Sequence, residues 1–232
     1  MLDLPSDHGA MHRFELREQV RTVRRGSRST LSKLDATIIL TSPLAIPLTD
    51  ALIGKDEELA AFWAKEKGRY RYDYVTFRCD LGAAAEKPFQ TVWVEVGLEA
   101  AHEEGETMAW SVAPKLLEDS RKTKTMVKLG AKFSMFSPEV ASEAEAETKQ
   151  WSLRARGEHT TRPYWELRAT DKAVLEGTYG FHLVVRSTAG VPVAGSLSAR
   201  AVVADRTFLI FVSESELDQP ASVAFTLPAS GA

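Results

Sequence analysis

Five histidines carry the acid–base and metal-binding potential of this chain: His8, His12, His102, His159 and His182. Histidine titrates near neutral pH and is the commonest metal ligand in proteins. An ordered zinc site needs several ligands held in place by the fold. No such spacing occurs here, because the pair of histidines nearest each other lies in a polar N-terminal stretch. Glycines also never form a phosphate-binding pattern that opens a helix. We therefore predict neither a metal site nor a cofactor.

His159 and His182 are the two histidines that could serve as catalytic bases. Each would need an acidic group and a nucleophile brought close by the fold. The sequence contains no recognisable serine elbow and no catalytic cysteine motif. A hydrolase-type enzyme that uses His159 or His182 on a β scaffold is therefore an alternative hypothesis, and a non-catalytic protein is the first.

The composition is that of an ordinary globular protein. The chain has 232 residues, of which 44% are hydrophobic and 26% charged, with 29 basic and 32 acidic side chains and a net charge of −3. Such a balance gives no field that would attract nucleic acid, so we expect no nucleic-acid partner. Cys79 is the single cysteine and alternates with Phe77 and Leu81, which predicts a buried thiol. With no disulfide and no signal-peptide pattern, we expect a cytoplasmic protein.

The elements that would position these side chains are mostly strands. From Tyr164 to Val212, apolar and polar side chains alternate within short runs, and turn residues lie between these runs. This alternation is typical of antiparallel sheet with one buried face. Similar runs lie earlier in the chain, and turns recur at intervals of about 8–12 residues. We predict an all-β or mostly β protein, an antiparallel β-sandwich of nine or ten strands with Greek-key-like connections. A closed β-barrel is the alternative.

The expected organisation is a single domain with a tail at each end. Residues 1–13 form a flexible N-terminal tail, residues 14–217 the sandwich, and residues 218–232 a C-terminal tail. One short helix is expected at about residues 56–67, because Asp56 can cap it and Gly68 can end it. Phe62 and Trp63 lie on one face of this helix and would pack it against a sheet. Phe208–Val212 is expected to be the last strand of the main series.

Residues 121–156 have the most unusual charge pattern. Lysines and glutamates each recur with a spacing typical of strands. In a hairpin that turns at Ser137-Pro138, the two charge types would face each other across the strands. The residues concerned are Lys124, Lys128, Lys132, Glu143, Glu145 and Glu147. Residues 139–149 could equally be a helix or a loop. We interpret the pattern as a solvated surface or as a docking surface. A membrane-inserting hairpin is a further alternative, although the charges count against it.

Aromatic residues on expected outer strand faces are the remaining candidates for binding. Trp93 lies opposite the apolar set of its strand and in phase with Glu95. An exposed tryptophan in a sheet is a candidate hot spot for partner binding. Tyr70, Tyr72 and Tyr74 form a similar stripe, which the helix would cover or a ligand would use. Trp110 and Trp165 are expected in the core.

Together these features favour a non-catalytic protein-binding module that acts as an accessory, adaptor or regulatory subunit. The partner would be another protein or a second copy of the chain. The candidate contacts are Trp93, the tyrosine stripe and the charged hairpin. A membrane partner is not expected, although a membrane-inserting hairpin would imply one.

Overall fold

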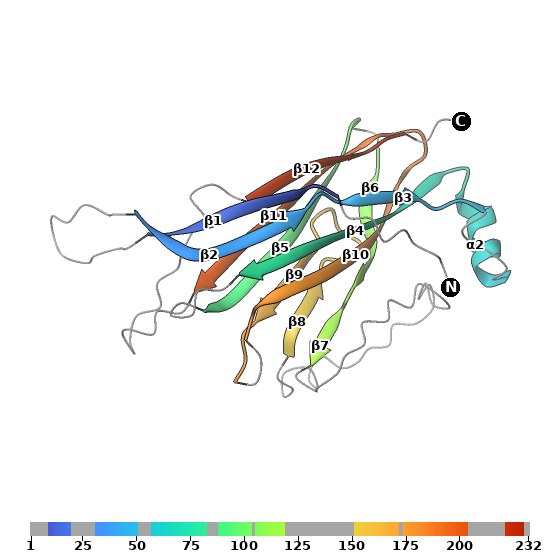
Figure 1. Cartoon of the computed structure of the whole chain (residues 1–232). Coiled ribbons are helices and arrows are strands. Elements are labelled where there is room, and N and C mark those ends of the chain that lie inside the picture. The colour runs from blue at the N-terminus through green and yellow to red at the C-terminus, as the bar shows by residue number, and fades with distance from the viewer. Residues whose placement is uncertain are drawn as a thin grey trace.

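The protein is a sandwich of two antiparallel sheets that do not close into a barrel, as Figure 1 shows. The computed structural model describes residues 9–19, 31–50, 57–82, 88–103, 105–118, 151–171, 174–203 and 221–229. Among these residues there are twelve strands and the helix α2 (Glu57–Glu66). The predicted sandwich is therefore confirmed. Two of the strands beyond the nine or ten expected are short: β3 (Leu44–Pro47) and β7 (Leu116–Glu118).

The first sheet has the strand order β1-β2-β4-β10-β6, with β3 pairing to β4 beside β2. Its longest ladder joins β4 to β10 over twelve residue pairs, from Gly177↔Leu81 to Thr188↔Tyr70. The strands of this sheet are β1 (Met11–Gln19), β2 (Leu31–Thr41), β4 (Tyr70–Gly82), β6 (Thr107–Ala113) and β10 (Gly177–Thr188). β1 begins at Met11, so its first three residues lie within the predicted N-terminal tail, residues 1–13.

The second sheet has the strand order β12-β11-β5-β9-β8-β7. Its further strands are β5 (Phe89–Ala100), β8 (Trp151–Arg156), β9 (Tyr164–Arg168), β11 (Val193–Val203) and β12 (Ala221–Leu227). β12 lies within residues 218–232, which the sequence analysis assigns to a tail. β4 and β6 belong to the first sheet, and β5 and β7 belong to the second. Each connection from β4 to β7 therefore passes from one sheet to the other.

The main core lies between the sheets and follows the period-two alternation of the sequence. Val75, Phe77, Cys79 and Leu81 of β4 are all buried on the inner face. Trp165 of β9 is fully buried and packs against Phe77 and Phe181 of the first sheet, with ring centroids 5.7 and 5.0 Å apart. Burial also raises the pKa of the Cys79 thiol to about 12, so this side chain stays protonated and apolar in character.

A second, smaller apolar cluster lies on the outer face of the first sheet, under α2. Its buried members are Leu48, Tyr70, Tyr72, Tyr74 and Val184, and its partly buried members are Ile46, Phe62, Trp63 and Trp110. The helix was predicted at this place, and Phe62 and Trp63 do attach it to the sheet. Figure 1 shows α2 at one end of the sandwich.

Trp110 corrects one prediction, because it belongs to this outer cluster and not to the main core. The register of β6 against β10 shifts between Val184 and Val185, so that Ala109 and Val112 both face inward. An irregularity of this kind changes which side chains face the interior. Trp110 consequently points toward the helix.

Two predicted features lie outside the described residues. The strand expected at Phe208–Val212 is one of them. The other is the charged hairpin, apart from its last strand, β8. The six charged residues of the predicted hairpin therefore all lie outside the described residues: Lys124, Lys128, Lys132, Glu143, Glu145 and Glu147.

Candidate partner-binding face

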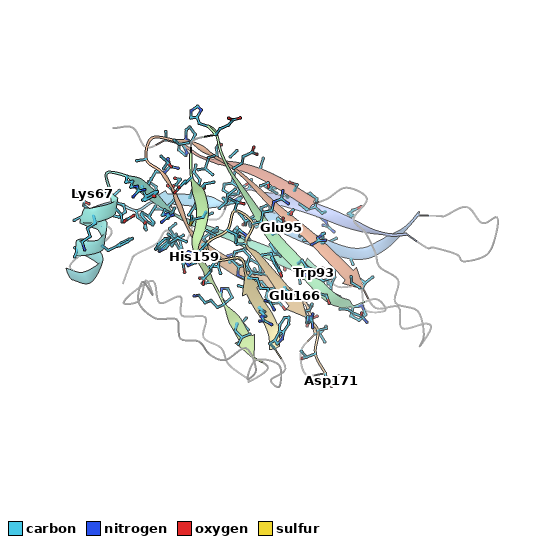
Figure 2. All side chains as sticks on the ribbon, turned by 180° about the vertical axis from the view of Figure 1, so that it is seen from behind. Lys67, Trp93, Glu95, His159, Glu166 and Asp171 are labelled. Carbon is cyan, nitrogen blue, oxygen red and sulfur yellow. The ribbon has the colours of Figure 1, made fainter. Side chains whose placement is uncertain are left out.

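Trp93 lies on the outer face of the second sheet, where it is partly exposed. Its strand neighbours Val92 and Val94 are fully buried on the opposite, inner face. Figure 2 shows Trp93, Glu95 and Glu166 close together over this sheet. The sequence predicts this phase for Trp93 correctly, since Trp93 and Glu95 share a face of β5.

The strand registers place Trp93 in a row of side chains that crosses five strands. Arg200 of β11 is the cross-strand partner of Trp93, and Glu166 of β9 is its partner on the other side. Glu166 is opposite Arg154 of β8, which is in turn opposite Leu116 of β7. We call Arg200, Trp93, Glu166, Arg154 and Leu116 the Trp93 row. Leu116 is 42% exposed and is one of three large apolar side chains exposed in the described chain.

Arginine–tryptophan contacts order this face. The Arg200 guanidinium lies 5.7 Å from the Trp93 ring centroid, and that of Arg168 lies 4.7 Å from the Trp151 ring centroid. Arg168 also holds Glu166 through a hydrogen bond of 2.8 Å and an ion-pair contact of 2.7 Å, both to Oε1. Cation–π contacts of this kind hold large side chains in one orientation, which lowers the entropic cost of binding a partner.

A second row runs parallel to the first, two residues along each strand. Glu95 of β5 is opposite Ser198 of β11 on one side and Tyr164 of β9 on the other, and Tyr164 is opposite Arg156 of β8. We call Glu95, Tyr164 and Arg156 the Tyr164 row. Within the described chain, neither Glu95 nor Arg156 has an ion-pair or hydrogen-bond partner for its side chain. The two rows together present tryptophan, tyrosine, arginine and glutamate, with an exposed leucine at the edge.

Tyr70, Tyr72 and Tyr74 lie elsewhere, in the cluster under α2. They are 9%, 1% and 2% exposed, so the structure does not offer their rings as contact area. Each hydroxyl has a partner: Glu66 for Tyr72 at 3.4 Å, Glu106 for Tyr70 at 3.3 Å, and His182 for Tyr74 at 2.6 Å. The helix covers Tyr72, the middle of the stripe, through Phe62 and Trp63, whereas Arg186 covers Tyr70 and His182 covers Tyr74.

Arg186 fills the space between two rings of this cluster. Its guanidinium lies 4.4 Å from the Tyr70 ring centroid and 4.8 Å from that of Trp110, and it approaches the Glu106 carboxylate at 3.9 Å. The cluster is thus a packed second core with its own internal cation, and it presents no open aromatic platform.

His182 lies at the edge of this second core. Its Nδ1 is 2.6 Å from the Tyr74 hydroxyl, and the two rings stack with centroids 5.8 Å apart. Burial, and then the charge of Arg78, lower the pKa of His182 below its ordinary value. Burial raises the pKa of Tyr74, so the hydroxyl keeps its proton and can donate it to the neutral imidazole.

His159 occupies a different place, in the turn between β8 and β9. Its backbone is left-handed, with φ of 61°, and its ring meets Trp110 edge-on at 5.3 Å. Within the described residues, neither His159 nor His182 has a hydrogen bond to a carboxylate or to a serine or cysteine side chain. A catalytic role would need such a group within hydrogen-bond reach.

Sequence reasoning found Trp93 but missed the rest of the face. Leu116, Arg154, Tyr164, Glu166 and Arg200 are ordinary residues in five separate strand patterns. They come together only through pairing between strands that are distant along the chain, and a single sequence contains no signal for that pairing. A tryptophan in phase with a charged residue was the one usable signal.

The described part of the chain contains no helix that is both long and apolar enough to span a membrane. No protein-family model matches the chain, and no curated protein does. Among solved structures, it is similar to the Clostridium perfringens NetB toxin in its membrane-inserted form, with 8% identity and a TM-score of 0.31 over 94% of this chain and 95% of that one. A TM-score this low carries no argument about function.

Proposed function

We propose that the protein is a non-catalytic binding module that docks another protein on the outer face of its second sheet. The observation that carries this proposal is the Trp93 row, in which a partly exposed tryptophan on the outer face of the sheet is contacted by Arg200. Tryptophan, tyrosine and arginine are the residues that most often dominate binding energy at protein interfaces. The accessory or regulatory role and the cytoplasmic location expected from the sequence are part of the same proposal.

The chemistry of the face suggests what a partner must present. Trp93 and Leu116 are three strands apart, which is about 14 Å at the usual strand spacing. Glu166 and Arg154 lie between them. A complementary surface would therefore have two apolar contacts about 14 Å apart, with a basic and an acidic group between them. Such mixed surfaces gain specificity from the charges and affinity from the apolar anchors.

The test is affinity purification from the native source with wild-type protein and two variants. Trp93→Ala removes the central anchor, and Thr226→Ala is the matched control, an exposed side chain on β12 of the same sheet. We expect a stoichiometric partner with wild type and Thr226→Ala, and at least a tenfold weaker recovery with Trp93→Ala, which corresponds to about 1.4 kcal/mol. A partner that is retained by folded Trp93→Ala would contradict the proposal.

A second candidate function is membrane insertion by the segment between β7 and β8. One observation favours it: β7 and β8 are antiparallel neighbours, with Glu118 opposite Trp151, so the chain leaves and re-enters the sheet at adjacent positions. The 32 intervening residues, 119–150, are far more than a tight hairpin needs, and connections of this length are usually functional or disordered. Each half could supply the roughly 9–11 residues that a spanning strand requires.

Dye release from liposomes tests this second candidate directly. Wild-type protein would release the dye, and a Leu129→Cys/Ala146→Cys variant would release it only after its engineered disulfide is reduced. Either single cysteine variant is the matched control. Absence of release from the wild type would remove this candidate and leave the protein-binding proposal unaffected.

A further inference from the structure

We propose that β12 is a dimerisation edge, at which two copies of the chain join their second sheets into one continuous antiparallel sheet. β12 is the last strand of the second sheet, and Figure 1 shows it along one border of the sandwich. Such a dimer does not rest on the partner-binding face, because it uses the backbone at the edge of the sheet and not the side chains of the Trp93 row.

The hydrogen-bond pattern of the second sheet leaves the outer edge of β12 unpaired. Successive residues of an antiparallel strand bond alternately to its two neighbours. Val96 donates to the Pro163 carbonyl at 3.0 Å, so the even-numbered residues of β5 bond to β9 and the odd-numbered ones to β11. The registers then make the odd-numbered residues of β11 and of β12 bond to each other. The N–H and C=O groups of Ser222, Ala224 and Thr226 therefore point away from the sheet, without a backbone partner among the described residues.

The other edge strands of the described sheets are protected against pairing, and β12 is not. β1 contains charged residues and a bulge between Glu15 and Arg17. β6 is covered by the turn after β8, since Ala109 exchanges backbone hydrogen bonds of 2.7 and 2.8 Å with His159 and Thr160. β7 has only three residues. Natural proteins use all these devices to prevent strands from joining. β12 has seven residues and no charged side chain, which is typical of an edge that pairs.

A second copy of β12 matches this edge when a two-fold axis perpendicular to the sheet lies midway between the two strands, beside Ala224. The strands then run antiparallel, with Ala224 opposite Ala224 and Ser222 opposite Thr226. Each of these facing pairs exchanges two hydrogen bonds, so all the outward N–H and C=O groups of the three residues find partners in both copies. Isologous interfaces require this self-matching.

The length of the strand favours the same register. An axis beside Ala224 pairs all seven residues of β12, whereas a slide by two residues would pair five. Pro220 and Pro228 each lie four residues from Ala224 in the sequence, so they would be opposite each other at the two ends of the ladder. Because proline has no N–H, the hydrogen-bonded ladder ends at these positions.

The side chains on both faces of β12 agree with this axis. On the inner face, Val223 would be opposite Phe225 of the second copy, in the closer type of antiparallel pair. Phe225 belongs to the core but is only partly buried. Its ring leans over Gly195 of β11, where a Cβ would collide with it, so the inner side of the edge is open to a further strand. On the outer face, the exposed hydroxyls of Ser222 and Thr226 would face each other, a favourable cross-strand pair.

The first sheet leaves room for the second copy. Trp165 of β9 packs against Phe77 of β4 and Phe181 of β10, so these strands lie over one another. β12 is three strands from β9, and β1 is two strands from β4. The second sheet therefore extends at least as far as the first on this side. β5, which carries Trp93, is two strands from β12, so the partner-binding face stays open in both copies.

Disulfide formation by cysteine variants tests the position of the axis, since the native Cys79 is fully buried. The axis sets Ala224 opposite its own copy at the Cα separation of about 5.5 Å of a hydrogen-bonded pair, which a disulfide can span. We expect Ala224→Cys to form a disulfide dimer in a glutathione buffer. Ser222→Cys is the matched control, because the same residue of the second copy lies about 14 Å along the ladder.

The control variant should form its dimer about tenfold more slowly, because its thiols lack the high effective concentration of a pair at the axis. Ser222→Cys mixed with Thr226→Cys should form a mixed disulfide as readily as Ala224→Cys forms its own. Equal rates for Ala224→Cys and Ser222→Cys would overturn the two-fold pairing.

Sedimentation of charge variants provides a second test. We expect wild type to be a dimer at micromolar concentration and Ala224→Lys to be a monomer, because two like charges would meet at the axis. Mixing Ala224→Lys with Ala224→Glu should restore a dimer, which separates loss of pairing from a folding defect. Ala194→Lys, an exposed position on β11, is the control and should remain dimeric.

A wild type that sediments as a monomer at all concentrations would overturn the dimer. If such a monomer also loses an affinity-purified partner in Ala224→Lys, the edge takes a strand from a different protein. Neither result affects the partner-binding face, which Trp93→Ala tests separately.

Discussion

At the scale of single residues, His182 shows how burial controls a titratable group. Its pKa is lowered, first by burial and then by the nearby Arg78 charge. The unfolded chain therefore takes up a proton at a higher pH than the folded chain does. Consequently the free energy of unfolding decreases as the pH falls through the unfolded value of 6.5 toward the lower folded value. A protonated imidazole also cannot accept a hydrogen bond from the Tyr74 hydroxyl, which lies 2.6 Å from Nδ1 of His182.

We therefore expect His182→Gln to lose less stability on acidification than the wild type. Glutamine is neutral at all relevant pH values and can still accept the Tyr74 hydrogen bond. Urea unfolding at about pH 7.5 and about pH 5 measures the difference, since this interval includes the ordinary histidine pKa. His102→Gln, at an exposed position, should behave as the wild type does. Equal acid sensitivity of His182→Gln and wild type would refute this explanation.

At the scale of elements, α2 is attached to the first sheet chiefly through aromatic contacts. Phe62 meets the Tyr72 ring at 5.8 Å and stacks on Trp110 at 6.2 Å. Asp50 accepts hydrogen bonds from Trp63 Nε1 and from Lys67, which lower its pKa and link Asp50 to the C-terminal end of α2. The Asp50–Lys67 ion pair is largely exposed, so its contribution to stability is small.

Truncation of Phe62 tests this attachment. Because Phe62 is only partly buried, we expect Phe62→Ala to lower the free energy of unfolding by about 1–3 kcal/mol, less than the 3–5 kcal/mol of a fully buried phenylalanine. Lys65→Ala, at an exposed position on the same helix, is the control. Hydrogen exchange of the α2 amides should accelerate in Phe62→Ala. Unchanged exchange would show that other contacts hold the helix.

Much of this element-scale structure could be predicted from the sequence, and the exceptions have physical causes. Alternation placed Val75, Phe77 and Trp165 inward, because burial on one face is a local property of each strand. The predicted inward orientation of Trp110 was wrong, since the orientation depends on a shift in the register between β6 and β10. β3 was missed because Pro43 and Pro47 indicate a break, although Pro47 is tolerated at the end of a short strand. The Tyr164 row could not be predicted, because it requires the order of the strands.

At the scale of the whole molecule, Arg71 connects the two sheets inside the sandwich. Its Nε donates to Asp73 at 2.7 Å, and its guanidinium also donates to the carbonyl oxygens of Leu227 and Pro228 at the end of β12. Both side chains of the ion pair are at most 7% exposed. Burial raises the pKa of Asp73 more than Arg71 lowers it, so for this carboxylate the cost of desolvation exceeds the attraction of Arg71.

This balance leads to an asymmetric prediction. Asp73→Ala leaves Arg71 buried without its carboxylate and should lower the free energy of unfolding by about 3–5 kcal/mol. The double variant Arg71→Met/Asp73→Leu removes both charges, and it should cost less than Asp73→Ala alone because no unpaired ion remains. Denaturant unfolding of the two variants and the wild type measures both values. If the double variant were the less stable of the two, the Arg71 bonds to Leu227 and Pro228 would outweigh the desolvation of the pair, and the sandwich would depend on this cation to hold β12 in place.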